Sequence, residues 1–213
     1  QRQMCIRDST YTLAHIVTAK FWQNVKENGL HLTVAETGWG KASWGKIYGQ
    51  WLCGCGVMVY DFDIFSPEKL LKVIEDFKVT SFCAPPTVYR YFIKKDMKKF
   101  DLSHLEHITT AGEALNPEVF EQVHKQTGLQ IMEGFGQTES VLMLGNLVGS
   151  TAKIGSLGKP TPLYNIMIAD NEGNRLPANE VGEIVVIPSE NQHGIFMGCL
   201  LYTSDAADDT PCV

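Results

Sequence analysis

Eight consecutive residues at positions 133–140, Glu-Gly-Phe-Gly-Gln-Thr-Glu-Ser, combine groups that suit a bound nucleotide phosphate. Two glycines flank an aromatic residue, so the backbone can bend sharply and approach a flat ligand without a Cβ in the way. The hydroxyl of Thr138 suits a phosphate oxygen, and the carboxylate of Glu139 suits a hard cation such as Mg²⁺. Because a short apolar segment precedes the run, we interpret it as a strand-to-turn site for a nucleotide phosphate and its metal. An ordinary glycine turn at the end of a strand is the alternative.

The elements that must position this run are predicted by hydrophobic periodicity. Helical spacing predicts helices over residues 10–26 and 44–52, around 88–94, and from Pro67 and Pro117 onward. Short apolar runs predict strands at residues 30–34, 56–60, 79–83, 107–110 and 129–132. Ser66 and Asn116 are the expected N-caps of the helices that they precede, and Gly128 closes the second of these.

The order of these elements predicts the fold class. Alternating strands and helices indicate an α/β fold with a parallel sheet, right-handed crossovers and flanking helices. Strands at 164–170 and 182–188, with a hairpin-type turn at 171–174, indicate a small β region after the sheet. Ligands of such sheets bind beyond the carboxyl ends of the strands. The turns at Gly112 and Gly134 both follow predicted strands, so we expect them to converge on one crevice.

The run at 133–140 resembles the G-[YF]-G-x-T-E signature of adenylate-forming enzymes, which include acyl-CoA synthetases, adenylation domains and luciferases. Four more segments match motifs of that superfamily in the same order: 84–90 (A-P-T-x-x-R), 110–115 (A-G-E-P), 155–160 and 182–184. Residues 37–46 are similar to a T-G-W-x-x-x-x-W-G-K pattern of medium-chain or acetyl-type acyl-CoA synthetases. The resemblance spans roughly residues 11 to 198.

The resemblance implies an adenine site. Gly112, Glu113 and Ala114 would form one wall, with Phe135 opposite and Glu133 accepting a hydrogen bond from the adenine amino group. Ala114 stands where the superfamily usually has proline, which leaves the loop less rigid. A surface carboxylate is the alternative for Glu113, and a core aromatic is the alternative for Phe135.

The same resemblance implies roles at the phosphates. Thr138 would bind the α-phosphate and Glu139 would hold Mg²⁺, and these two residues are the catalytic candidates. Gly134, Gly136 and Gln137 complete the nucleotide-binding segment.

The implied reaction is the ATP-dependent activation of a fatty, medium-chain carboxylate to acyl-AMP, followed by transfer to CoA. Gly136 matches the position where acetate-specific relatives place a tryptophan, so the acyl pocket is expected to admit longer acids. Trp39 resembles a tryptophan that lines this pocket, although core packing is nearly as common for tryptophan. The alternatives are an amino-acid or aryl-acid adenylation domain and a non-catalytic nucleotide-binding module.

Composition excludes other classes of partner. The formal net charge of −6 argues against nucleic acid, and no apolar run is long enough to span a membrane. The resemblance implies small-molecule partners (ATP, a carboxylic acid and CoA), and we expect a cytoplasmic location. The six cysteines include no zinc-like CxxC pair. Cys53 and Cys55 fit buried free thiols better than a redox or metal pair. His104 and His107 have no further ligand near them in sequence.

Both ends differ from the superfamily pattern. We interpret residues 1–9 and 199–213 as non-native tails, and residues 10–198 as an internal part of an AMP-binding N-terminal domain. The Gly-rich phosphate loop is expected before this region, and the ribose-binding aspartate and a lysine-bearing domain after it. We therefore expect the chain alone to be inactive.

Overall fold

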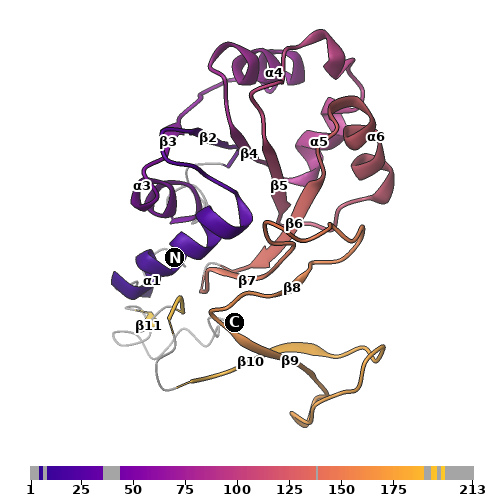
Figure 1. Cartoon of the computed structure of the whole chain (residues 1–213). Helices are drawn as coiled ribbons and strands as arrows, with labels where there is room; N and C mark the ends of the chain where they lie inside the picture. Colours follow the sequence, from indigo (N-terminus) through magenta and orange to yellow (C-terminus); the bar gives the residue numbers. More distant parts are fainter. Residues whose placement is uncertain are drawn as a thin grey trace.

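A seven-stranded sheet forms the centre of the protein (Figure 1). The computed structural model describes residues 5–6, 9–35, 44–137, 139–189, 193–195 and 198–199. The sheet has the order β3-β2-β4-β5-β6-β7-β8. Its strands are β2 (Leu30–Thr33), β3 (Gly56–Met58), β4 (Ser81–Cys83), β5 (His107–Ala111), β6 (Ile131–Gly136), β7 (Leu142–Gly145) and β8 (Lys159–Pro160). Strands β3 to β6 pair in parallel, whereas β7 and β8 join antiparallel. The α/β class and the parallel sheet are confirmed.

The helices flank this sheet and follow the predicted order. They are α1 (Ser9–Ile16), η2 (Val17–Trp22), η3 (Trp44–Tyr48), α3 (Gly49–Leu52), α4 (Pro67–Asp76), α5 (Pro86–Phe92), η4 (Met97–Lys99) and α6 (Pro117–Thr127). The predicted caps are confirmed: Ser66 Oγ accepts from Lys69 N–H at 3.3 Å, and Asn116 Oδ1 accepts from Glu118 N–H at 2.8 Å. Gly128 ends α6 with a φ of 75°, a conformation that glycine adopts without strain.

The sheet presents two chemically different faces because side chains alternate along each strand. One face carries Leu32, Phe82, Ile108 and Ile131, which pack with residues of α4, α5 and α6 in the main apolar core. Figure 1 shows these three helices together on one side of the sheet and α1 and α3 on the other.

The face under α1 and α3 is polar. His31 is fully buried, and its ring nitrogens lie 2.8 Å from Ser81 Oγ and 2.7 Å from Thr33 Oγ1. His107 Nε2 donates to the backbone oxygen of Trp22 at 2.7 Å. His31 bonds to side chains of the sheet and His107 bonds to the backbone of η2, so the second face is held by hydrogen bonds as well as by apolar contacts.

Besides β6, two predicted elements differ from the structure. The helix expected over 10–26 ends at Trp22, after a change to wider π-helical turns at residue 17. The strand expected to be buried at 56–60 is the edge strand β3, which is partly exposed because it has one neighbour.

The larger correction concerns β6. The sequence predicted a strand that ends at Met132 and a turn at Gly134, but Glu133, Gly134, Phe135 and Gly136 all belong to the strand. Gly134 pairs with Ala111 of β5 on one side and with a residue of β7 on the other. The turn follows at Gln137, and β7 was not predicted. Pairing on both sides keeps this glycine-containing segment extended.

A small β region follows, as predicted. Strands β9 (Asn165–Ala169) and β10 (Glu183–Ile187) pair antiparallel below β8 in Figure 1. Asp170 Oδ1 accepts from the backbone N–H groups of Glu172 and Asn174 at 3.0 and 2.8 Å, which fixes the predicted turn. That turn leads back to Arg175, which bridges Ala169, and not directly to β10. A further pair joins β1 (Cys5–Ile6) to β11 (Gly198–Cys199).

Candidate functional site

The loop after β5 and the end of β6 lie side by side at the carboxyl edge of the sheet. This follows from the parallel pairing of the two strands, in which Ala111 lies opposite Gly134. Gly112 has a φ of 103°, so the chain turns sharply there, and a Cβ on it would meet no atom within 4 Å. The loop therefore borders open space at the edge where ligands of parallel sheets bind. The two segments lie side by side at one edge, as predicted, whereas the crevice expected between them stays a prediction.

Glu133 connects this loop to β6. Its side chain is 4% exposed, and its Oε1 accepts from Leu115 N–H at 3.2 Å. Burial raises the pKa of the Glu133 carboxyl, and hydrogen bonds from the backbone N–H groups of Leu115 and Gly155 partly oppose that rise. The Glu133 carboxylate therefore holds the loops that contain Leu115 and Gly155 against β6. Its expected hydrogen bond to adenine stays a prediction.

Glu113 is attached to α5. Arg90 Nη2 donates to Glu113 Oε2 at 2.9 Å and to Thr87 Oγ1 at 2.6 Å, and Thr87 Oγ1 donates to Glu113 Oε1 at 3.3 Å. Both charged side chains are about half exposed. Sequence reasoning assigned no role to Thr87 or Arg90, although it quoted the segment that contains them. Only the spatial proximity of α5 to the loop reveals this pairing.

Phe135 is half-buried in β6. It packs against a cluster that includes Tyr11, Val141, Met143 and Tyr164. This position is compatible with the core-aromatic alternative, and the adenine-stacking role stays a prediction.

A glycine is required at position 136 because the backbone of Val141 approaches it closely. A Cβ there would lie 2.6 Å from Val141 O and 3.2 Å from Leu142 Cα. A side chain at position 136 would therefore clash with the backbone at the start of β7. The acyl-pocket role of Gly136 rests on the resemblance alone.

Glu139 follows the end of β6 and is 8% exposed. Ser140 and Gln137 hold the turn around it, since Ser140 N–H donates to Gln137 O and Gln137 N–H donates to Ser140 Oγ, both at 3.3 Å. In the described parts of the chain, no three His, Cys, Asp or Glu side chains gather as a metal site. One carboxylate still fits Mg²⁺ bound mainly through substrate phosphates. Thr138 and Trp39 lie outside the described residues.

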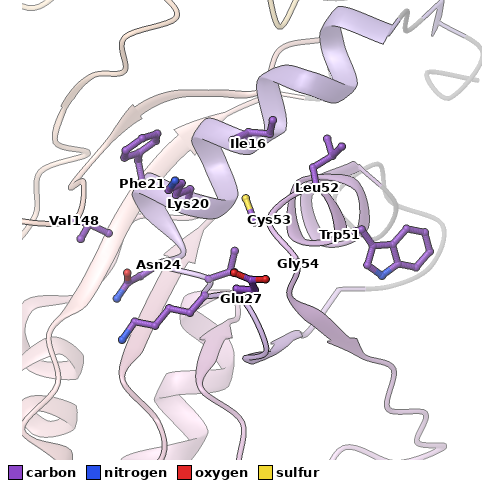
Figure 2. A pocket seen from close by; sticks show the side chains of 12 residues that line it. Ile16, Lys20, Phe21, Asn24, Glu27, Trp51, Leu52, Cys53, Gly54 and Val148 are labelled. Carbon is purple, nitrogen blue, oxygen red and sulfur yellow. The ribbon is translucent and has the colours of Figure 1, made fainter.

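A cavity of about 1040 Å³ lies between η2 and α3, away from this edge (Figure 2). It is lined by Ile16, Lys20, Phe21, Asn24, Val25, Lys26, Glu27, Trp51, Leu52, Cys53, Gly54 and Val148. Several of these residues directly precede β2 and β3, so the cavity opens near the amino ends of the strands. None of the candidate site residues lines it. Cys53 and Cys55 are both free thiols; Cys55 is buried, as expected, whereas Cys53 is half-buried.

A comparison with protein families identifies the chain. A family model described as "AMP-binding enzyme" matches residues 9–196. The chain belongs to this AMP-binding enzyme family. Among curated members, it is 37% identical over 190 residues to the mitochondrial acyl-coenzyme A synthetase ACSM3 of Mus musculus. It is 38% identical over 178 residues to the mitochondrial ACSM4 of Homo sapiens.

The match to these AMP-binding relatives covers 88% and 84% of this chain but 33% and 31% of theirs. The chain therefore spans about a third of the length of the curated relatives it matches.

Solved AMP-binding structures share the fold. The crystal structure of a Brucella canis acyl-CoA synthetase superposes with a TM-score of 0.81 at 24% identity, over 89% of this chain and 36% of that one. The anthranilate CoA ligase AuaEII, in complex with anthranoyl-AMP, gives a TM-score of 0.78 at 26% identity, over 87% of this chain and 36% of that one. No helix in the described ranges has the length and apolar character to cross a membrane.

Proposed function

We propose that this chain forms part of the active site of an AMP-forming acyl-CoA synthetase that activates a medium-chain fatty acid. The observation that carries the proposal is the meeting of the 112–116 loop with the end of β6 at the carboxyl edge of the sheet. The names of the curated relatives support acyl-CoA synthesis. Acyl-AMP would form first, from ATP and the acid, and CoA would then displace AMP.

The residues of this chain would bind and orient the nucleotide. Gly112, Glu113 and Ala114 present backbone to one face of adenine, and Phe135 lies toward the other. Glu133 keeps that loop at a fixed distance from β6, because its carboxylate holds Leu115 N–H.

The turn after β6 would hold the phosphates. The hydroxyl of Thr138 donates to the α-phosphate, while Gln137 shapes the turn. Glu139 would hold Mg²⁺, which when bound neutralises charge on the phosphates as the acid attacks. In this scheme no side chain of the chain acts as a nucleophile.

An aryl acid is the second candidate substrate. The likeness to the anthranilate CoA ligase structure, at 26% identity, favours it over amino acids. The relatives' names place them in mitochondria, so a cytoplasmic location stays a prediction from sequence.

The test measures pyrophosphate release by the full-length protein that contains this sequence, with ATP, Mg²⁺ and a panel of acids. We expect release with hexanoate and octanoate, and acyl-CoA once CoA is added. Release only with anthranilate or benzoate would establish the aryl-acid alternative. Nucleotide binding without pyrophosphate release with any acid would instead support a non-catalytic nucleotide-binding module.

One variant and two truncations test the parts. Glu139→Gln is expected to lower the rate most at limiting Mg²⁺, and an unchanged rate there would remove the metal role. The 213-residue chain alone is expected to release no pyrophosphate, because it spans about a third of the length of its relatives.

Residues 10–198 are proposed to be the family portion, with 1–9 and 199–213 as tails. If so, removing the tails will change the unfolding temperature of the chain little, although it removes the pairing of β1 with β11.

A further inference from the structure

Asn146, directly after β7, joins the turn at residues 155–158 to the strand that carries Glu133. It is 5% exposed, and its backbone N–H donates to Glu133 O at 2.9 Å. Its side-chain Nδ2 donates to Ser156 O at 2.9 Å and, over a longer distance of 3.5 Å, to Glu133 O. A buried amide is costly to leave unpaired, so these bonds hold the 155–158 turn and β6 at a defined separation.

The 155–158 turn also lies against the Glu133 carboxylate. Gly155 N–H donates to that carboxylate. The other end of the turn is packed onto β7, since a Cβ on Gly158 would lie 2.1 Å from the carbonyl carbon of Gly145. Lys159 of β8 then pairs with Gly145. The backbone of the turn is therefore fixed on β7, and its N–H group is fixed on Glu133.

The carboxylate of Glu133 is thus held from two sides. Leu115 N–H approaches it from the 112–116 loop, and Gly155 N–H approaches it from the 155–158 turn. A carboxylate has about four acceptor positions on its two oxygens, so two such bonds orient it and leave capacity for a ligand donor. Residues 155–160 were singled out in the sequence as a motif to which no role was given. These contacts supply a role for that motif.

We infer that Asn146 is a positioning residue for adenine recognition. By fastening the 155–158 turn to β6, it sets the orientation in which the Glu133 carboxylate accepts from the adenine amino group. Asn146 acts through the turn and through Glu133, without a contact of its own to the nucleotide. The inference rests on the proposed function, because it takes adenine to lie at Glu133.

The test measures how much the amino group of adenine contributes to binding. Calorimetric titration of the full-length protein gives the Kd for AMP and for purine ribonucleoside 5′-monophosphate, which lacks that amino group. We expect the wild type to prefer AMP by about tenfold or more, as a hydrogen bond to a charged group does. Asn146→Ala should reduce this preference to about threefold or less, because a released turn lets the carboxylate leave a favourable hydrogen-bond angle.

Thr161→Val is the control for a merely structural role. Thr161 is 2% exposed, and its Oγ1 donates to Leu142 O of β7 at 2.9 Å. The variant removes a buried hydrogen bond to the same strand that Asn146 follows, but that bond does not involve the 155–158 turn. It should lower stability and keep the wild-type preference for AMP. An unchanged preference in Asn146→Ala, or an equal loss in Thr161→Val, would overturn the inference.

A second pair of variants avoids the buried amide. Gly155 and Gly149 are both exposed, with φ values of 73° and 85°, and a Cβ on either would meet no atom within 4 Å. Alanine is disfavoured in this left-handed conformation at both positions. Gly155 donates to Glu133, however, whereas Gly149 lies in a separate turn after β7.

Gly155→Ala should therefore lower the preference for AMP by about threefold or more through the altered hydrogen-bond geometry, and Gly149→Ala should leave it unchanged. Equal preferences in these two variants would overturn the inference, even if the Asn146→Ala protein does not fold.

The wild type separates this inference from the proposed function. A wild-type protein that releases pyrophosphate but binds the two nucleotides equally would overturn the inference and leave the proposed function standing. A protein that binds neither nucleotide would overturn the proposed nucleotide site, and this inference with it.

Discussion

Glu133 shows how one side chain in this protein can serve both packing and binding. In the sequence it is the first residue of a predicted nucleotide-binding motif. In the structure it is buried and bonded to the 112–116 loop, which is expected to lie on the other side of the ligand. A buried carboxylate that receives backbone N–H groups fixes loop geometry, but its charge remains unfavourable in a low-dielectric setting. Its replacement should therefore affect stability and binding in opposite directions.

Glu133→Gln should become progressively more stable relative to wild type as pH rises from 4 to 8. The pKa of Glu133 is raised by burial from its ordinary 4.5, so the folded protein holds this proton more strongly than the unfolded chain. Its stabilising contribution is complete below pH 4.5 and is lost as pH rises through the folded-state pKa. Glutamine does not titrate and can still accept from Leu115 N–H. Urea unfolding at several pH values measures the difference.

Glu121→Gln on the exposed side of α6 controls for the change in net charge. A stability difference between Glu133→Gln and wild type that narrows as pH rises would contradict the expectation.

Gly134→Ala should destabilise the protein by about 1–3 kcal/mol through overpacking. The added Cβ would lie 2.6 Å from Trp22 Cε2 and 2.7 Å from Leu142 Cδ1. Chemical denaturation measures the loss, and Trp22→Phe should recover part of it by withdrawing the indole. Gly56→Ala is the matched control, because its nearest atom would be 3.3 Å away. A Gly134→Ala protein as stable as wild type would show that β6 shifts freely.

At the scale of elements, the sequence predicted those helix and strand limits that are set by residues close together in the chain. The limits of α6 follow from Asn116, Pro117 and Gly128, which act within a few residues of themselves. The extent of β6 does not, since glycines are unfavourable in isolated strands and these ones are held by neighbouring strands and by Trp22. The contact between Arg90 and the 112–116 loop is equally non-local. The candidate site was predicted from its motifs, whereas the contacts that hold its loops could be recognised only in the fold.

The element-scale prediction concerns this Arg90–Glu113 pair. Arg90→Ala should weaken nucleotide binding by roughly threefold to tenfold, because the 112–116 loop loses its attachment to α5. It should change the free energy of unfolding by less than about 1 kcal/mol, since both side chains are half exposed. Calorimetric titration of the full-length protein with AMP measures the first effect, and thermal unfolding measures the second.

Exchanging the charges, as Arg90→Glu with Glu113→Arg, should restore part of the affinity that Arg90→Ala loses. Unaltered AMP affinity in Arg90→Ala would show that the loop is held by Glu133 alone.

At the scale of the whole molecule, segments distant in sequence are joined beside the sheet. Tyr164 is buried just before β9, and its hydroxyl donates to Gly194 O at 2.7 Å and accepts from Val141 N–H at 3.1 Å. Tyr11 of α1 donates to Ser140 O at 3.3 Å in the same cluster. The start of the described chain, the region after β6 and the end of the small β region therefore meet at one place.

Tyr164→Phe should lower the free energy of unfolding by about 1–3 kcal/mol, since two hydrogen bonds are lost at roughly 0.5–1.5 kcal/mol each. Urea unfolding of the 213-residue chain measures this change. Tyr91→Phe, whose side chain is 44% exposed, serves as the control and should have little effect. Equal stability of Tyr164→Phe and wild type would show that the hydroxyl does not join these segments.

The double-sided pairing of β6 also has a dynamic consequence. Amide protons of an interior strand exchange with solvent only when neighbouring strands separate, so those of β6 should be among the slowest in the chain. The backbone that we propose to face adenine would then be preorganised before any ligand arrives. Ligand-dependent protection would be confined to the turn at 137–140 and to the 112–116 loop. The motif would thus work as a rigid surface, against which its neighbouring loops close.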